Sequence, residues 1–310
     1  MYTVVNFTKI FSCGDADFEA ELGLVYKRVT VAMEKRGIKF VFARPAQYGG
    51  GTLFKEVYYS KGGPWEILTD IHTDAVYIKS PNIIHLLDKE VLTISERGLE
   101  EINTDKWKMY QELAEFMAPT FPLSRENWQT AIQNIKTEYC IIKPVDGSLG
   151  VGIIVKPVRE LIQGDLIPEK RYIVQELIDS SKGMPGSVVG RHDIRVLVFN
   201  GKITPAFMSI AQDNSYLANL SRGARKLSFS FDDIPERGKE MIDAIEKKLS
   251  RFFPRVYSID FLFDPEGKPY LIEINTGPGY PYPVFHQDEY INKIDDMLAD
   301  AFVESLEKAK

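Results

Sequence analysis

The sequence predicts a mixed α/β (α+β) protein that divides into two or three compact units. In residues 1–100, short apolar segments alternate with an amphipathic helical pattern, which is typical of an open α/β unit. Further along, pairs of apolar strands flank turns that contain glycine, aspartate or proline, as in β-hairpins. A chain of 310 residues with 44% hydrophobic content can bury a substantial core.

The first unit is expected to alternate strands with one long helix. The glycine-rich stretches at 48–51 and 60–64 do not precede a helix with the spacing of a dinucleotide fingerprint, so both are expected to be loops. After this unit, Thr104 or Asp105 is a suitable N-cap for a helix over 107–117. The other elements expected here are strands at 4–7, 39–43 and 75–78 and a helix over 17–35.

A glycine-rich hairpin loop follows. Lys143 lies in an apolar strand that leads into residues 146–152, and a second strand comes after them. Gly147 and Gly150 let backbone N–H groups approach phosphates closely, Ser148 adds a hydroxyl donor, and Lys143 adds a point charge. The loop suits a nucleotide, but taken alone these glycines favour the turn of an ordinary hairpin.

Two later strands carry polar side chains suited to the same ligand. One apolar strand ends near Glu176 and would read adenine through backbone atoms and this carboxylate. The next strand places Asp193 and Arg195 on one face, where an arginine can hold a phosphate or carboxylate with two hydrogen bonds. A polar loop then offers Asn219 and a second guanidinium, Arg222. Each of these side chains has an alternative role in a salt bridge or a turn.

A hairpin over residues 257–275 holds the most informative side chains. If Asp264 pairs with Pro269 across its turn, the antiparallel register places Asp260 opposite Glu273. The two strands are expected at 257–263 and 270–274, with turn residues 264–267 between them.

One face of this hairpin is suited to a metal ion. Glu273 and Asn275 share a face because side chains alternate along a strand. Two opposed carboxylates repel each other unless a cation lies between them, and with an amide oxygen they form an all-oxygen set suited to Mg²⁺. The alternative is a solvated polar face of an edge hairpin. The apolar residues that alternate with these groups favour a buried strand instead.

The C-terminal segment leaves one question open. The aromatic and proline-rich run at 280–285 would either shape a substrate pocket or pack the chain end. Apolar residues at helical spacing over 289–310 predict an amphipathic packing helix.

Composition excludes several classes of function. The net charge of −6 disfavours nucleic acid as a partner. The two cysteines, Cys13 and Cys140, are far apart, which fits a reduced compartment and offers no zinc framework. The chain lacks a run of eighteen apolar residues and an N-terminal signal pattern, so a cytoplasmic protein without a membrane segment is expected.

Taken in order, these motifs resemble the ATP-grasp superfamily of carboxylate–amine ligases, most closely the RimK-type branch that contains ribosomal-protein glutamate ligase. The resemblance covers roughly residues 104–282 and implies an ATP-grasp fold that follows an N-terminal α/β domain. It implies domains at 1–102 and 103–310, the second with a lid-bearing part at 103–180 and a metal-binding part at 181–310. The motifs that carry it are Asp105-Lys106, Ile142-Lys143-Pro144, the 147–152 loop, Val174-Gln175-Glu176, Asp193-Ile194-Arg195, Asn219 to Gly223, Asp260, and Glu273-Ile274-Asn275 followed by Pro278-Gly279.

The resemblance also implies roles for individual residues. The cofactors would be ATP and two Mg²⁺ ions, with Mn²⁺ as an alternative ion. The substrates would be a small-molecule or peptide carboxylate and an amine, and the oligomeric state stays open. Residues expected to contact ATP are Lys106, Lys143, Gly147, Ser148, Gly150, Gln175, Glu176, Leu177, Ile178, Asp193 and Asn219; the expected metal ligands are Asp260, Glu273 and Asn275; the expected catalytic guanidinium groups are Arg195 and Arg222.

Three functions are compatible with these residues. The first is an ATP-dependent ligase that forms an amide or peptide bond through an acyl phosphate and releases ADP and phosphate. The second is another ATP-grasp activity, either a small-molecule kinase or a peptide-modifying macrocyclase. The third is a nucleotide-binding protein without turnover. The presence of every candidate metal ligand argues against this third function.

Overall fold

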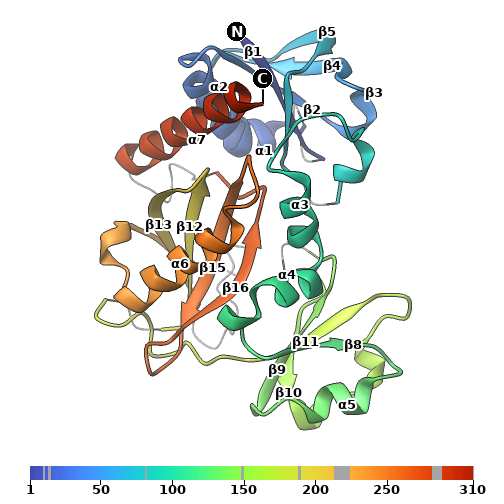
Figure 1. Cartoon of the computed structure of the whole chain (residues 1–310), viewed down its shortest axis with the longest axis vertical. Helices are drawn as coiled ribbons and strands as arrows, with labels where there is room; N and C mark the ends of the chain where they lie inside the picture. Colours follow the sequence, from blue (N-terminus) through green and yellow to red (C-terminus); the bar gives the residue numbers. More distant parts are fainter. Residues whose placement is uncertain are drawn as a thin grey trace.

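The computed structural model describes residues 1–9, 11–12, 15–80, 82–147, 150–187, 190–212, 224–280 and 288–309. Within these ranges the chain forms three β-sheets in succession, flanked by helices (Figure 1). The predicted mixed α/β class is therefore confirmed. None of the helices in these ranges combines the length and the apolar character needed to cross a bilayer.

The N-terminal sheet has seven strands in the order β3-β4-β2-β1-β6-β7, with β5 paired to β4. Strands β2, β1, β6 and β7 are parallel, as expected for an open α/β unit, and β3, β4 and β5 add an antiparallel extension. The expected loop at 48–51 is wrong in part because Tyr48–Gly50 pairs with β4 as a short strand. The strands are β1 Tyr2–Phe7, β2 Ile38–Ala43, β3 Tyr48–Gly50, β4 Leu53–Tyr59, β5 Glu66–His72, β6 Ala75–Ile78 and β7 Thr93–Ile94.

Helices from both ends of the chain cover this sheet. The expected helix over 17–35 is interrupted: α1 (Ala16–Phe18) passes through a π-helical turn at Glu19–Gly23 into α2 (Leu24–Glu34). The C-terminal helix α7 (Asp288–Lys308) returns to lie beside α2 (Figure 1), with an ion pair of 2.8 Å between Arg36 and Asp296. The predicted packing helix is confirmed because its apolar row is buried: Ile291, Ile294, Leu298, Ala301, Phe302 and Leu306.

Two short helices connect the first sheet to the second. Helix α3 (Arg97–Thr104) leads directly into α4 (Lys106–Leu113). Asp105 is the N-cap of α4, and its carboxylate accepts hydrogen bonds from the backbone N–H groups of Trp107 (2.9 Å) and Lys108 (3.0 Å). The predicted helix is thus confirmed, although its last residues form a 3₁₀ turn instead.

The second sheet lies at the opposite end of the molecule from the N-terminal sheet (Figure 1). Its four strands are antiparallel in the order β10-β9-β11-β8. Pairing of β9 with β10 confirms the predicted glycine-rich hairpin. The elements are β8 Thr120–Leu123, α5 Trp128–Gln133, β9 Tyr139–Pro144, β10 Ile154–Pro157 and β11 Tyr172–Glu176.

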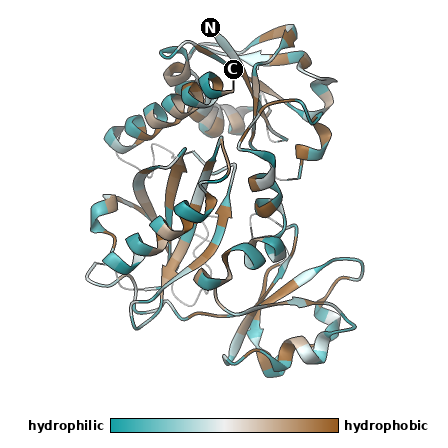
Figure 2. Cartoon of the chain, viewed as in Figure 1, coloured by the Kyte–Doolittle hydropathy of each residue, from teal (hydrophilic) through white to brown (hydrophobic). Residues whose placement is uncertain are grey.

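The third sheet is antiparallel in the order β14-β13-β12-β15-β16 and has two unlike faces. Ile194, Val196 and Val198 of β12 face a core shared with α3, α4 and α6, whereas Leu197 and Phe199 belong to the core under α7. Figure 2 shows hydrophobic strands here under helices that carry hydrophilic residues along one side. The elements are β12 His192–Phe199, β13 Lys202–Ile210, β14 Arg225–Phe229, α6 Glu236–Leu249, β15 Val256–Phe263 and β16 Pro269–Asn275.

The hairpin of β15 and β16 confirms the predicted juxtaposition with a different turn register. Asp260 pairs with Glu273, as expected, but Phe263 rather than Asp264 pairs with Pro269. An irregularity after Asp260 absorbs the one-residue difference, because the pairing shifts between that residue and Phe261. The two carboxylates therefore meet across the strands even though the assumed pairing at the turn was wrong.

Candidate functional site

One cavity of about 990 Å³ is lined by residues from all three sheets. Every sequence-predicted site residue that the structure describes lines this cavity, which brings together positions from 106 to 275. Ser148, Asn219 and Arg222 lie outside the described residues. The predicted residues that line the cavity are Lys106, Lys143, Gly147, Gly150, Gln175, Glu176, Leu177, Ile178, Asp193, Arg195, Asp260, Glu273 and Asn275.

The predicted metal ligands form a hydrogen-bonded cluster with Arg195. This arginine faces Asp260 across β12 and β15, donates Nε to Oδ1 at 2.7 Å, and also donates Nη2 to Oδ2. The Nδ2 group of Asn275 donates to Oδ2 of Asp260 and to Oε1 of Glu273, both at 3.1 Å. The amide N–H₂ group thus lies between the two carboxylates, and it is the positive end of the amide dipole that relieves their repulsion.

Asp193 is the third carboxylate beside this cluster. It lies two residues before Arg195 on the same face of β12, as predicted, and its Oδ1 has no hydrogen-bond partner among the described residues. Burial, followed by the negative charge of Asp260, raises the pKa of Asp193 to about 7. A buried carboxylate oxygen without a donor is a favourable place for a cation or a hydroxyl group.

Lys143 lies at the boundary between the second sheet and the cavity. Only 6% of the residue is exposed, and its Nζ donates to Oε1 of Gln175 at 2.8 Å. The amide of Gln175 is held in turn because Nε2 donates to Oγ1 of Thr120 at 2.8 Å. Burial lowers the pKa of Lys143 to about 8, and Glu273 opposes this shift. The lysine is therefore positioned by neutral acceptors, without a carboxylate ion pair among the residues that the structure describes.

Lys106, the first residue of α4, reaches the glycine-rich segment. Its Nζ donates to the backbone carbonyl of Gly147, and burial lowers its pKa. The segment needs glycine at position 152, where φ is +75° and a Cβ would lie 3.0 Å from Cγ of Pro144. The structure thus holds Lys106 against the loop and Lys143 on the adjacent strand.

The segment after β11 lines the same cavity at its far side. Oε1 of Glu176 accepts a hydrogen bond from the backbone N–H of Lys136 at 2.8 Å. The backbone N–H of Leu177 donates to the carbonyl of Tyr139 at 3.3 Å. Leu177 and Ile178 add apolar surface next to this carboxylate, which is the combination expected for a flat heterocycle.

Several charged residues that also line the cavity were not predicted as site residues, among them Lys79, Glu100 and Lys226. The Nζ of Lys226 donates to Oγ of Ser209 at 2.5 Å. Lys79 comes directly after β6, and ligands of parallel sheets commonly bind at the carboxyl ends of the strands, so its position was a usable signal. Glu100 carried no such signal, because only its burial in α3 distinguishes it from an ordinary helix-surface acid.

The polar side chains that line this cavity include carboxylate, amide, lysine and arginine groups. Among the described residues, no three or more His, Cys, Asp or Glu side chains form a group that could hold a metal ion. Asp260 and Glu273 are accordingly a carboxylate pair completed by an amide, and water or phosphate oxygens would have to supply the remaining ligands.

Comparison with solved structures gives the class of fold. D-alanyl-alanine synthetase A from Vibrio cholerae superposes with a TM-score of 0.65 at 15% identity, over 98% of each chain. An ATP-grasp ligase associated with a ribosomally synthesised peptide in Chryseobacterium gregarium, solved with ADP and a leader and core peptide, superposes with a TM-score of 0.63 at 15% identity, over 98% of this chain and 97% of that one. The fold is the ATP-grasp fold.

A family model then places the chain more narrowly. The model for the RimK-like ATP-grasp domain matches residues 103–299, so the chain belongs to this family. A probable alpha-L-glutamate ligase from Rhodopirellula baltica is 25% identical over 164 residues, which cover 52% of this chain and 37% of that protein. A second one, from Aeromonas salmonicida, is 27% identical over 45% of this chain and 43% of its own length. The chain thus matches less than half the length of these curated relatives.

Proposed function

We propose that the protein is an ATP-dependent carboxylate–amine ligase that forms an amide or peptide bond and releases ADP and phosphate. The observation that carries the proposal is the convergence, in one cavity, of the Asp260–Glu273 pair with Arg195, the buried Lys143 and the half-buried Lys106. Family membership supports it, because the RimK-like ATP-grasp model covers residues 103–299 and the chain is similar to probable glutamate ligases.

The chemistry follows from where the charges lie. A substrate carboxylate attacks the γ-phosphorus of ATP, the bond to ADP breaks, and an acyl phosphate forms. An amine then attacks the acyl carbon, loses a proton, and expels phosphate as the C–N bond forms. Lys106 and Lys143 hold the phosphates, and Arg195 stabilises the charge that develops on the acyl oxygen. Closure of the glycine-rich loop, of which the structure describes Gly147 and residues 150–152, over the phosphates would keep water from the acyl phosphate.

The donor set fits Mg²⁺. Asp260, Glu273 and Asn275 would hold the metal, provided that the amide of Asn275 rotates so that Oδ1 replaces the N–H₂ group between the carboxylates. The unpartnered oxygen of Asp193 lies beside them and could accept a water of the ion. When bound, two Mg²⁺ ions would neutralise charge on the transferred phosphate, and Mn²⁺ could replace them.

The substrates, the domains and the location are parts of the same proposal. L-Glutamate and short peptides are the first compounds to test, because the relatives are named for a glutamate ligase and a solved neighbour holds a peptide.

We propose residues 1–102 as one domain and 103–310 as the ATP-grasp domain, with a division near residue 180. A cytoplasmic location rests on the two widely separated cysteines of the sequence.

The test is ADP release from Mg-ATP in the presence of a pool of L-glutamate, other amino acids and short peptides, with hydroxylamine added. Hydroxylamine converts an acyl phosphate to a hydroxamate, so ADP together with hydroxamate is the expected result. Glu273→Gln should abolish both products, whereas Glu266→Gln, an equal charge change at an exposed turn of the same hairpin, should leave both unchanged.

Other outcomes would reassign the site. ADP without hydroxamate would indicate a kinase, and AMP would exclude the acyl-phosphate route. Binding of Mg-ATP without any product from the pool would support the third function, a nucleotide-binding protein. Equal activity of Glu273→Gln and wild type would remove the hairpin from the mechanism.

A further inference from the structure

Lys79 projects from the N-terminal sheet into the cavity. It follows β6, whose four residues are all buried, and its Nζ donates to the backbone carbonyl of Pro278, three residues beyond the candidate metal ligand Asn275. The ammonium also lies 3.7 Å from the centroid of the Tyr280 ring, a cation–π contact. Both contacts orient the lysine, yet neither neutralises its charge.

The backbone around Lys79 is fixed by a close approach. A Cβ atom on Gly277 would lie 3.1 Å from the carbonyl oxygen of Ile78 and 3.2 Å from Cα of Lys79. Only a glycine therefore allows the chain that leaves β16 to run against the end of β6. The first sheet and the metal-ligand hairpin meet here, so the ammonium of Lys79 is positioned by both.

Lys79 and Arg195 place two cations on this side of the cavity. Burial, followed by the charge of Arg195, lowers the pKa of Lys79 well below its ordinary value. No carboxylate of the described residues lies within ion-pair distance of Lys79, whereas Nε and Nη2 of Arg195 are engaged by Asp260. The remaining Nη1 lies 3.9 Å from the position that a Cβ on Gly279 would take, next to Pro278, and has no acceptor in the described part of the chain.

Two half-buried cations that repel each other are stabilised by an anion between them. We propose that Lys79 and Nη1 of Arg195 together bind a carboxylate oxygen of the acid substrate and hold it for attack on ATP. This inference rests on the proposed ligase function and names a substrate-binding residue outside the matched family region of 103–299. Lys79 would also make the N-terminal sheet a part of the active site.

The electrostatic neighbours favour a carboxylate over a phosphate at this point. The charges of Glu273, Lys106 and Asp193 influence the pKa of Lys143. The two lysines proposed to bind phosphate are therefore coupled to the metal-ligand hairpin. The charge that acts on Lys79 is Arg195 alone. Lys79 is thus coupled to the guanidinium and not to the lysines assigned to phosphate, and together with its contact to Pro278 this assigns it to the acid that receives the phosphate.

The experiment compares wild type with Lys79→Gln, which keeps a donor for the Pro278 carbonyl but removes the charge. Lys79→Met removes both, and Lys55→Gln, at an exposed position of β4, is the matched control. In the hydroxamate assay with the pooled amino acids and peptides, Lys79→Gln should raise the pool concentration for half-maximal rate about 10- to 100-fold, the effect of one charge-assisted hydrogen bond. The KM for Mg-ATP should stay within twofold, and the control should match wild type.

A second measurement does not depend on turnover. In the presence of Mg²⁺ and a non-hydrolysable ATP analogue, sodium acetate should raise the Tm of wild type above that in sodium chloride of the same ionic strength, because it binds only the folded protein. Neither Lys79 variant should show this difference.

These measurements separate the inference from the function on which it rests. Wild type that makes no hydroxamate contradicts the ligase, and the acetate comparison still tests Lys79. An equal acetate effect in wild type and Lys79→Gln, or none in wild type, would overturn the anion site. A raised KM for Mg-ATP with an unchanged pool dependence would assign Lys79 to phosphate instead.

Discussion

Arg195 and Asp260 lie opposite each other on neighbouring strands, and the guanidinium engages both oxygens of the carboxylate. Asp260 is 2% exposed, so its charge is paired inside the protein rather than solvated. The same oxygens are the ones that a metal ion would use. The arginine therefore orients the carboxylate before the metal arrives, and it competes with the metal for the same oxygens.

The first prediction concerns this competition. In Arg195→Gln, the buried carboxylate of Asp260 loses its hydrogen-bonded partner beside Glu273 and Asp193, so the metal-free protein should lose on the order of 3 kcal/mol of unfolding free energy. Mg²⁺ should then raise the Tm of the variant more than that of wild type, because it replaces the missing charge. Thermal unfolding with EDTA and with Mg²⁺ measures both effects.

A matched control is Arg251→Gln, which removes an exposed ion pair with Glu112 at 2.7 Å. Its stability should change by less than about 1 kcal/mol, and its response to Mg²⁺ should equal that of wild type. An identical Mg²⁺ response in Arg195→Gln would show that the metal does not share Asp260 with the arginine.

The second prediction concerns Lys143 and pH. Since burial lowers the pKa of Lys143 to about 8, the ammonium is present below pH 8 and is lost as the pH rises through that value. If this ammonium holds a phosphate, the affinity for Mg-ATP should fall by up to about tenfold per pH unit above 8. Isothermal titration with Mg-ATP between pH 7 and 9.5 measures the change.

Lys143→Met provides the comparison for that series. Its affinity should be low at pH 7 and should no longer depend on the titration near pH 8, because the group that titrates has been removed. A variant that keeps the pH dependence of wild type would assign the titration to another group.

Much of the site could be predicted because its chemistry lies in local sequence. The turn at 264–267 and the alternation of polar and apolar residues determined that Asp260 and Glu273 share a hairpin face, and the irregularity after Asp260 corrected a pairing error that the pattern could not reveal. Likewise, Asp105 caps α4 as its position before the helix indicated, which orients Lys106 toward the glycine-rich segment.

The rest depends on contacts between distant parts of the chain. Strand β12 pairs with β15 although β13 and β14 intervene in sequence, so the Arg195–Asp260 pair has no local signature. Lys79 reaches the cavity only because the chain after β16 touches the end of β6. Strand β3 was read as a loop because its glycines are typical of turns, and its pairing with β4 overrides that preference.

The third prediction concerns Glu100, a buried acid of α3. The residue is 1% exposed and its Oε1 has no partner among the described residues, so burial raises its pKa to about 8. The folded protein therefore binds a proton that the unfolded chain releases near pH 4.5. Stability should fall as the pH rises from 4.5 to 8, by about 1.4 kcal/mol per unit across this window.

Glu100→Gln should remove that dependence, because the amide is neutral in both states. The variant should be more stable than wild type at pH 8.5 and similar to it at pH 5, as measured by urea unfolding at both values. Parallel stability curves for the two proteins would show that Glu100 is not protonated in the folded state.

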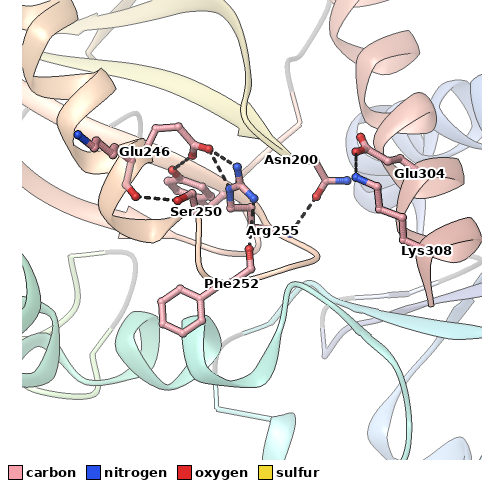
Figure 3. Close-up of polar contacts among 9 residues, drawn as sticks. Asn200, Glu246, Ser250, Phe252, Arg255, Glu304 and Lys308 are labelled. Carbon is pink, nitrogen blue, oxygen red and sulfur yellow. Dashed lines mark hydrogen bonds and ion pairs between the residues drawn. The ribbon is translucent and has the colours of Figure 1, made fainter.

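The last prediction concerns the largely buried ion pair of Arg255 and Glu246, which Figure 3 shows. The two side chains are 11% and 15% exposed, Nε of Arg255 donates to Oε1 of Glu246 at 2.9 Å, and the hydroxyl of Tyr257 donates to Oε2 at 2.5 Å. Glu246→Gln keeps the shape but leaves the guanidinium buried without a counter-charge. The variant should lose about 3–5 kcal/mol of unfolding free energy, measured by urea denaturation.

Glu304→Gln, at a residue shown in the same figure, is the control: it makes the same charge change in an exposed ion pair and so separates the effect of burial from the effect of charge. Its carboxylate pairs with Lys308 at 2.7 Å along one helix face, where the lysine side chain is 59% exposed, so the loss should be about 0.5 kcal/mol or less. The same chemical change thus separates the two environments. Similar losses of unfolding free energy in both variants would mean that Arg255 becomes solvated when its partner is removed. The pair would then not anchor α6 to the strand that carries Asp260.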